Sequence, residues 1–258
     1  MSVNTSAIIP PMANIVKFFL TEGSNRYIIV FNTRCCGDDE MENTKKVNNQ
    51  SVGEEIANSI THGIGALCAI AMAVVAIVYA AIKGDAMSVV SASLYGASLI
   101  ILYLCSTLYH SLTPYKAKKV FQILDHCSIF ILILGSYIPI CLSLIRGAMG
   151  WTLFGINAFC TVLGIVLNSI NLNRWHKYCM VLYVVMGWSI ISCIDTVAKL
   201  VPTPGMILLV TGGLSYTLGI IFFAIKKLKF AHSIWHLFVL AGSILQYFAF
   251  LFYALPVR

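Results

Sequence analysis

Charged side chains are scarce in this chain. They make up 10% of its 258 residues, whereas about a quarter of an ordinary soluble domain is charged. Acidic residues are scarcer still, because after Glu55 the chain contains only Asp85, Asp125 and Asp195. Hydrophobic residues account for 59% of the sequence. This composition excludes a soluble globular protein and predicts an all-α protein that crosses a membrane several times.

Two other classes of protein lack their usual features here. The net charge is +7, but the basic residues fall singly or in short groups between apolar segments, and no basic face alternates with stacking aromatic residues. The nine cysteines include no Cys-x-x-Cys pair, and most lie in apolar surroundings, as small packing residues do. We therefore expect no nucleic-acid partner and no disulfide framework.

Long apolar segments fill the chain from residue 52 onwards. A bilayer core about 30 Å thick requires roughly 20 apolar residues of helix. Seven segments meet this requirement: 56–82, 87–112, 120–142, 149–168, 178–198, 206–225 and 231–255. Gly135 and Pro139 predict a kink in the third segment. Short connections, such as Asn171 to Arg174, predict one antiparallel bundle of seven transmembrane helices over residues 52–258.

Basic residues are unevenly distributed between the connections. If the chain before the first segment is cytoplasmic, ten Lys and Arg residues lie on that side and four on the other. Cytoplasmic loops of membrane proteins carry an excess of Lys and Arg. The sequence therefore predicts a multi-pass protein of the cell (plasma) membrane with its N-terminus in the cytoplasm and its C-terminus outside.

Residues 1–51 differ from the rest of the chain. Pro10-Pro11, Lys17 and Glu22 interrupt the apolar patches of this region, so no run matches a membrane span or the core of a signal peptide. We predict a polar, disordered N-terminal extension. We also predict Met41 as the true start of the protein, because the coherent pattern begins just after it.

Histidines lie near segment ends that reach the same side of the membrane. His232 and His236 share one helix face and lie about 6 Å apart along the axis, which suits two ligands of a single Zn²⁺. Ser106 and His110 repeat this spacing in the second segment. Each pattern also fits a structural role, because histidines anchor helices at interfaces and membrane serines often bond their own backbone.

Asp125 lies inside the third apolar segment. Because a carboxylate that faces lipid is costly, Asp125 is expected to face a metal, a water or a histidine, or to pair with Lys118 or Lys119. Three histidines, Asp125 and Ser106 come from three segments that reach the same depth. Catalytic zinc is usually held by three protein ligands with one position open, and it activates water to attack a carbonyl. Asp125 can orient that water or carry its proton, and Ser106 can stabilise an oxyanion.

At these residues the chain resembles a known family. The stretch EEIANSITHGIG, from Glu54 to Gly65, is similar to the opening of the hemolysin III proteins, the bacterial branch of the progestin and adipoQ receptor (adiponectin receptor-like) family. Three further elements look like the signatures of that family and occur in the expected order: Ser106-x3-His110, Asp125-His126 and His232-x3-His236. The resemblance covers roughly residues 52–258.

The resemblance implies an intramembrane zinc ion near the cytoplasmic face. His110, His232 and His236 would be its ligands, Asp125 would hold the zinc-bound water, and Ser106 would lie beside it. Related families are lipid amide hydrolases. The resemblance therefore implies ceramidase-like activity on an acyl-amide lipid, within membrane-lipid homeostasis.

Three alternatives remain open at this point. Glu54, Asn58 and His62 share a helix face, which either lines the entrance of the site or forms a capped, solvated helix start. The second alternative is a channel-forming cytolysin, as the family name suggests, although apolar helices with short loops favour a permanently inserted protein. The third alternative is a lipid sensor or receptor in which the zinc is structural.

Overall fold

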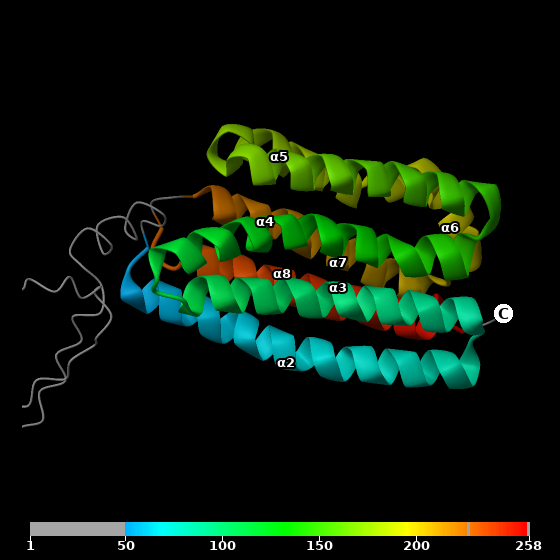
Figure 1. Ribbon diagram of the computed structural model, residues 1–258. Coiled ribbons are helices and arrows are strands. Elements are labelled where there is room, and N and C mark those ends of the chain that lie inside the picture. The colour runs from blue at the N-terminus through cyan, green and yellow to red at the C-terminus, as the bar shows by residue number, and fades with distance from the viewer. Residues whose placement is uncertain (1–49, 226–227, 257–258) are drawn as a thin grey trace, which may run out of the picture. The chain divides into compact units, whose positions relative to one another are not determined.

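The computed structural model describes residues 50–225 and 228–256, which form helices and no strand. The helices lie side by side with nearly parallel axes (Figure 1). They are α2 (Val52–Lys83), α3 (Ala86–Ser111), α4 (Tyr115–Ile138), the π-helix η1 (Pro139–Ile145), α5 (Gly147–Gly187), the 3₁₀-helix η2 (Ser189–Cys193), α6 (Ile194–Leu200), α7 (Thr203–Ala224) and α8 (Ala231–Tyr253). The all-α prediction is confirmed for these residues. The predicted start at Met41 and nearly all of the predicted extension lie outside them.

Six helical stretches of the described chain are long and apolar enough to cross a membrane. They are Val52–Lys83, Ala86–Ser111, Tyr115–Ile145, Gly147–Leu200, Thr203–Ala224 and Ala231–Tyr253. The fourth stretch contains 54 residues, which as one straight helix would extend about 80 Å. That length is far greater than a bilayer core of about 30 Å, so one straight crossing does not account for this stretch.

The chain reverses direction inside α5. Asn171 has extended backbone angles (φ −161°, ψ 94°), and its Oδ1 accepts a hydrogen bond from the Arg174 backbone N–H (3.0 Å), as an N-capping side chain does. Asn157, in the half of α5 before Asn171, donates from its Nδ2 to the Oγ of Ser189, which lies just after the end of α5 (3.0 Å). These two residues would lie about 48 Å apart in a straight helix. The two halves of α5 therefore lie side by side and antiparallel.

The helices pack in the order α5, α4, α3, α2, α8 and α7. Small residues allow the close contacts, because the buried face of α2 is a stripe of alanines: Ala66, Ala69, Ala73, Ala76 and Ala80. Gly96 of α3 lies against this stripe, where an added Cβ would come within 2.6 Å of the Ala73 Cβ. Packing between small residues is the usual way in which helices associate in a membrane.

The predicted kink site in the third segment coincides with a change of helix type. At Pro139 the α-helix α4 gives way to the π-helix η1. Four residues earlier, Gly135 packs against Ser98 so closely that a Cβ would lie 2.0 Å from the Ser98 Oγ. Gly135 is therefore required by the contact between α3 and α4.

An ion pair connects the ends of α3 and η1. Asp85 caps α3 by accepting a hydrogen bond from the Ser88 N–H (2.9 Å), and its Oδ2 lies 2.7 Å from Arg146 Nη2. The Ser88 hydrogen bond and then the Arg146 guanidinium lower the pKa of Asp85 to about 2. The carboxylate is therefore ionised throughout the physiological pH range, and its cap and ion pair are lost only as the pH falls toward 2.

We expect Gly164→Ala to destabilise the protein. A Cβ at this position in the first half of α5 would lie 2.1 Å from the Cζ of Phe130 in α4, whose side chain is fully buried. Overpacking of this kind costs about 1–3 kcal/mol, and thermal unfolding in detergent measures it. Gly155→Ala is the matched control, because nothing lies within 4 Å of a Cβ there. Equal unfolding temperatures for the two variants would contradict the packing of α5 on α4.

Candidate metal centre

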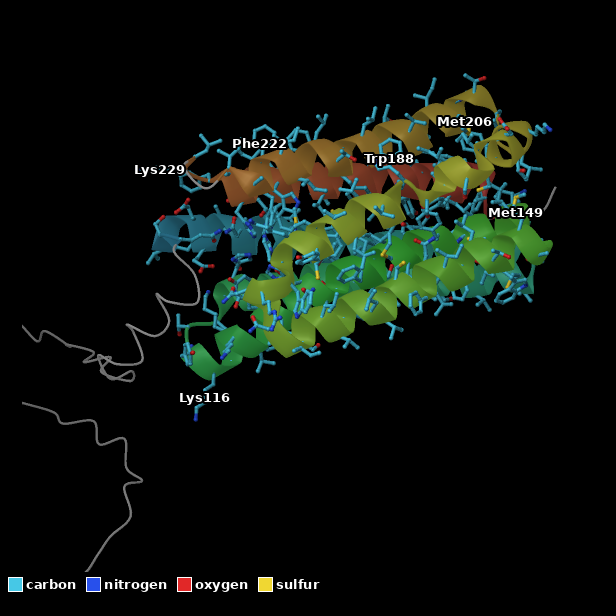
Figure 2. All side chains as sticks on the ribbon, turned by 90° about the horizontal axis from the view of Figure 1, so that it is seen from above. Lys116, Met149, Trp188, Met206, Phe222 and Lys229 are labelled. Carbon is cyan, nitrogen blue, oxygen red and sulfur yellow. The ribbon has the colours of Figure 1, made fainter. Side chains whose placement is uncertain are left out.

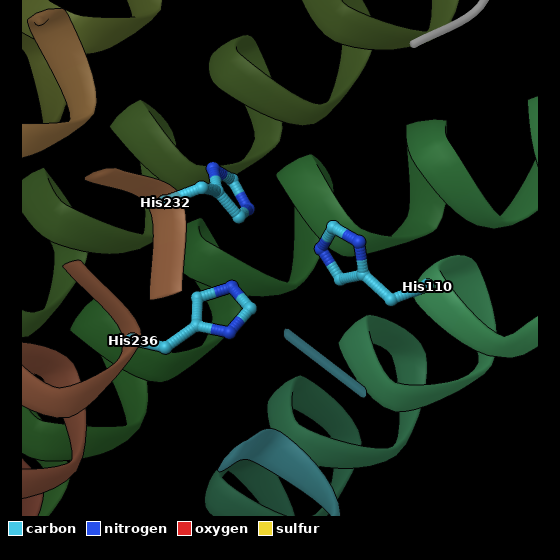
Figure 3. A group of neighbouring side chains, drawn as sticks. All are labelled: His110, His232 and His236. Carbon is cyan, nitrogen blue, oxygen red and sulfur yellow. The ribbon is translucent and has the colours of Figure 1, made fainter. Parts of the chain in front are cut away.

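Three histidines converge at one end of the bundle. His110 lies in the last turn of α3, and His232 and His236 lie in the first two turns of α8. One ring nitrogen from each lies within 4.8 Å of those of the other two. Figure 3 shows the three rings pointing toward a common point between the helices. The structure therefore places three potential metal ligands together from two helices that are distant in sequence.

The unpaired nitrogens of these rings fit a cation. The Nε2 atoms of His110, His232 and His236 are all buried and have no hydrogen-bond partner in the described chain. A buried polar atom without a partner costs about 1–3 kcal/mol. Zn²⁺ bound tetrahedrally at 2.0–2.1 Å needs nitrogens about 3.3 Å apart, which small side-chain rotations can provide. The three histidines can therefore bind a metal ion.

The His110 ring is oriented by a buried ion pair. Its Nδ1 lies 2.7 Å from Glu55 Oε2, and the other oxygen of Glu55 lies 2.9 Å from Lys118 Nζ. A carboxylate only accepts hydrogen bonds, so the Nδ1 of His110 carries the proton and the Nε2 keeps its lone pair. Carboxylate partners of this kind usually orient metal-binding histidines.

The His236 ring is oriented by Thr61. The Thr61 hydroxyl donates to the Asn58 carbonyl oxygen (2.9 Å) and lies 3.1 Å from the Nδ1 of His236. Because the hydroxyl proton is already used, the His236 Nδ1–H donates to the Thr61 oxygen. The Nε2 of His236 therefore also has a free lone pair directed toward the cluster.

The first turns of α2 also hold the start of α8. Glu54 forms a capping box with Ser51, and its Oε1 accepts a hydrogen bond from the Phe230 backbone N–H (3.1 Å). Phe230 has a left-handed backbone (φ 59°), which is unfavourable for a bulky residue. Asn58 Oδ1 accepts a hydrogen bond from Ser233 Oγ (2.5 Å). Of the predicted polar stripe, Glu54 thus caps the helix, whereas Asn58 is fully buried against α8.

Asp125 and Ser106 lie next to this cluster. Both are buried, with 3% and 0% of their surfaces exposed, and the Asp125 carboxyl interacts with His110, His126 and Ser106. Ser106 Oγ forms no hydrogen bond with its own helix, so the structural role open to a membrane serine is not observed. Lys118, the alternative partner of Asp125, binds Glu55 instead.

The other three histidines lie close to the cluster without joining it. His62 stacks on His236, with 3.4 Å between ring centroids, and neither of its buried ring nitrogens has a hydrogen-bond partner in the described chain. His126 and His176 lie together with centroids 6.2 Å apart. These rings contribute no nitrogen to the three-histidine group.

Sequence reasoning missed two residues that touch the proposed ligands, Glu55 and Thr61. A glutamate in the first turn of a helix is ordinarily explained by the helix dipole, and a threonine in an apolar segment by its bond to its own backbone. One signal was available, because Glu55, Asn58 and His62 follow the spacing of a single helix face.

The chain is similar to known proteins over most of its length. The Haemolysin-III related family model matches residues 50–247. Hemolysin-3 of Bacillus cereus is 45% identical over 207 residues, which are 80% of this chain and 94% of the relative. The Hemolysin-3 homolog of Bacillus subtilis (strain 168) is 41% identical over 207 residues, 80% of this chain and 97% of the relative.

A more distant relative comes from animals. The monocyte to macrophage differentiation factor of Homo sapiens is 28% identical over 210 residues, which are 76% of this chain and 82% of the relative. Residues 50–247, which the family model matches, include α2, α3 and most of α8, which supply the three histidines and the residues that orient them. The resemblance recognised in the sequence is confirmed, and the chain belongs to the Haemolysin-III related family.

Proposed function

We propose that this protein is a zinc-dependent hydrolase of amide-linked lipids, such as ceramides, in the plasma membrane. The observation that carries the proposal is the convergence of three imidazoles, each with a buried and unpaired Nε2, beside a buried carboxyl and a buried hydroxyl. Ionisable groups at membrane depth are costly, and they generally mark a functional site.

An apolar cavity beside the cluster supports a lipid substrate. The cavity has a volume of about 170 Å³ and lies between α3, α4, the second half of α5, α7 and α8. Phe223 and Trp235 line the cavity, and both rings also contact His232. An acyl chain in this cavity would place its linkage near the histidines.

The groups around the cluster suit hydrolysis of a carbonyl compound. A zinc ion bound by the three histidines would supply a Lewis acid and activate water near neutral pH. In this proposal Asp125 accepts a proton and returns it to the leaving amine. The buried Ser106 hydroxyl, which lies beside Asp125, would donate a hydrogen bond to a carbonyl oxygen as negative charge develops on it.

We further propose seven membrane crossings with the N-terminus in the cytoplasm. The reversal of α5 at Asn171 supports two crossings within the stretch from Gly147 to Leu200. Lys116 and Lys229 lie at one end of the bundle, and Met149 and Met206 lie at the other (Figure 2). The first end is also the histidine end and carries the excess of basic residues, as cytoplasmic ends do.

Epitope tags at the two termini test this topology. With seven crossings, a C-terminal tag reacts with antibody in intact cells, whereas an N-terminal tag reacts only after permeabilisation. Six crossings would place both tags on the same side. Equal accessibility of the two tags would therefore overturn the seven-crossing proposal.

Metal analysis of the purified protein tests the zinc site. We expect about one zinc per chain after purification without chelators, and its loss in the His232→Ala, His236→Ala double variant. Glu55→Ala should weaken zinc binding by about 10- to 100-fold, measured by competition with a fluorescent chelator. Glu55→Gln should lose less, because its amide oxygen still accepts from His110. Unchanged affinity in Glu55→Ala would contradict the orienting role of Glu55.

Release of fatty acid from lipids tests the reaction itself. Zinc-loaded protein should release fatty acid from ceramide or another N-acyl lipid, measured by mass spectrometry. Asp125→Asn should keep its zinc and lose activity by at least about 100-fold. Asp195→Asn is the matched control, because Asp195 is exposed in the first turn of α6. A zinc-loaded protein that cleaves none of these lipids would favour the alternative of a lipid sensor with structural zinc. Single-channel conductance in bilayers would favour the alternative of a channel-forming cytolysin.

A further inference from the structure

One polar side chain lines the apolar cavity without a hydrogen bond. Gln246 of α8 is among the lining residues, and its Oε1 is buried with no partner in the described chain. Other polar side chains of the wall have hydrogen-bond acceptors: Tyr137 and Tyr183 donate to the carbonyl oxygens of Gly187 and His126, and Thr217 donates to the carbonyl oxygen of Gly213. An amide in apolar surroundings without a partner is unfavourable, so Gln246 is suited to a bound group.

A cluster of hydroxyls lies beside Gln246. The Tyr103 hydroxyl donates to Ser243 Oγ (2.8 Å), and the Tyr216 hydroxyl lies 2.9 Å from the same atom. Only one proton can lie between Tyr216 and Ser243, so one hydroxyl proton of this pair has no acceptor among the described residues. Tyr216 also lines the cavity.

Tyr216 and Gln246 are near neighbours across the contact between α7 and α8. A Cβ at Gly212 would lie 2.8 Å from the Cγ of Gln246. Gly212 lies one helical turn before Tyr216, so the two share a face about 6 Å apart. The hydroxyl of Tyr216 and the amide of Gln246 therefore line the same part of the cavity, one as a donor and the other as an acceptor.

The depth of this pair corresponds to the middle of a long acyl chain. Trp235 lines the cavity near the histidines, and Phe250 lines it farther along the same helix. Gln246 follows His236 by ten residues, or about 15 Å along α8. The cavity wall on either side of Gln246 is mainly apolar. A polar group here therefore faces the interior of the chain, well away from its head group.

The cavity also lies between α5 and α7. Its lining includes residues of the second half of α5 and of α7, two helices that are not close-packed neighbours. Trp188 reaches from α5 toward α7 (Figure 2), where its indole donates to Thr217 Oγ1 (3.1 Å). His176 of α5 also contacts Phe223 of α7, with 5.6 Å between the ring centroids. Because side-chain contacts stand here in place of close helix packing, the membrane is the expected source of the ligand.

From these observations we propose that Gln246 and Tyr216 form a binding subsite for an acyl chain that carries a hydroxyl group near its middle. A hydroxyl both donates and accepts, so it can receive the free proton and donate to Gln246 Oε1. An unsubstituted chain would leave Gln246 Oε1 and the free hydroxyl proton unpaired, which costs affinity. This inference rests on the proposed function only in taking a long-chain lipid as the ligand.

Binding of hydroxystearic acids tests the subsite without any turnover. Purified protein is titrated with stearic acid and with isomers that carry the hydroxyl at different carbons, each competing with a fluorescent fatty acid. We expect a mid-chain isomer to bind about tenfold more tightly than stearic acid. Isomers hydroxylated near the carboxyl group should show no such gain.

Two variants and one control locate the effect. Gln246→Leu and Tyr216→Phe should each reduce the preference for the mid-chain isomer while leaving stearic acid binding unchanged, and the unfolding temperature checks that they fold. Ser215→Ala is the control, because Ser215 donates to the Phe238 carbonyl oxygen and is not among the residues that line the cavity. It should keep the preference.

The outcomes separate this inference from the proposed function. Equal binding of all isomers, no binding of any, or a preference that survives in both variants would overturn the subsite. Selective binding by a protein that cleaves no lipid would retain the subsite and refute the hydrolase. Cleavage of lipids by a protein that binds all the isomers equally would retain the hydrolase and refute the subsite.

Discussion

The Glu55 carboxylate binds the ring of His110 and the ammonium of Lys118 at the same time, and three helices are positioned by these two contacts. Lys118 is buried and also donates to the Tyr109 carbonyl oxygen. A buried charge is stable only when it is paired and hydrogen-bonded. Each member of this group therefore requires the others, and together they fix the direction of the His110 lone pair.

The same division of roles extends to the rest of the site. Helices α3 and α8 provide the three imidazoles, whereas α2 provides none of them and orients two. Thr61 holds His236, Asn58 holds Ser233, and Glu54 holds the backbone at Phe230. Orientation of this kind sets which nitrogen of a histidine is free. The polar start of α2 thus determines how the ends of the other helices can act on a ligand.

The positions of the apolar segments could be predicted from the sequence, whereas most partners of individual side chains could not. Five of the seven predicted segments each coincide with one helical stretch, because runs of apolar residues are long, whereas the fourth and fifth both fall within Gly147–Leu200. The grouping of His110 with His232 and His236 followed from helical spacing and the family resemblance. The partners of Glu55 could not be inferred, because Lys118 lies 63 positions away and a charged pair leaves no periodic signal. The π-helical turn after Pro139 was also hidden, since a proline marks a change in a helix without specifying its form.

The contacts between α2 and α8 have a consequence for biosynthesis. Among the described helices α2 is made first and α8 last, so Asn58 and Thr61 enter the membrane long before Ser233 and His236 exist. Polar side chains in a helix are costly in lipid until they find partners. The last helix to leave the ribosome is therefore the one that completes the surroundings of the first. A chain interrupted before α8 would keep exposed polar groups in α2, and these would distinguish an unfinished protein from a finished one.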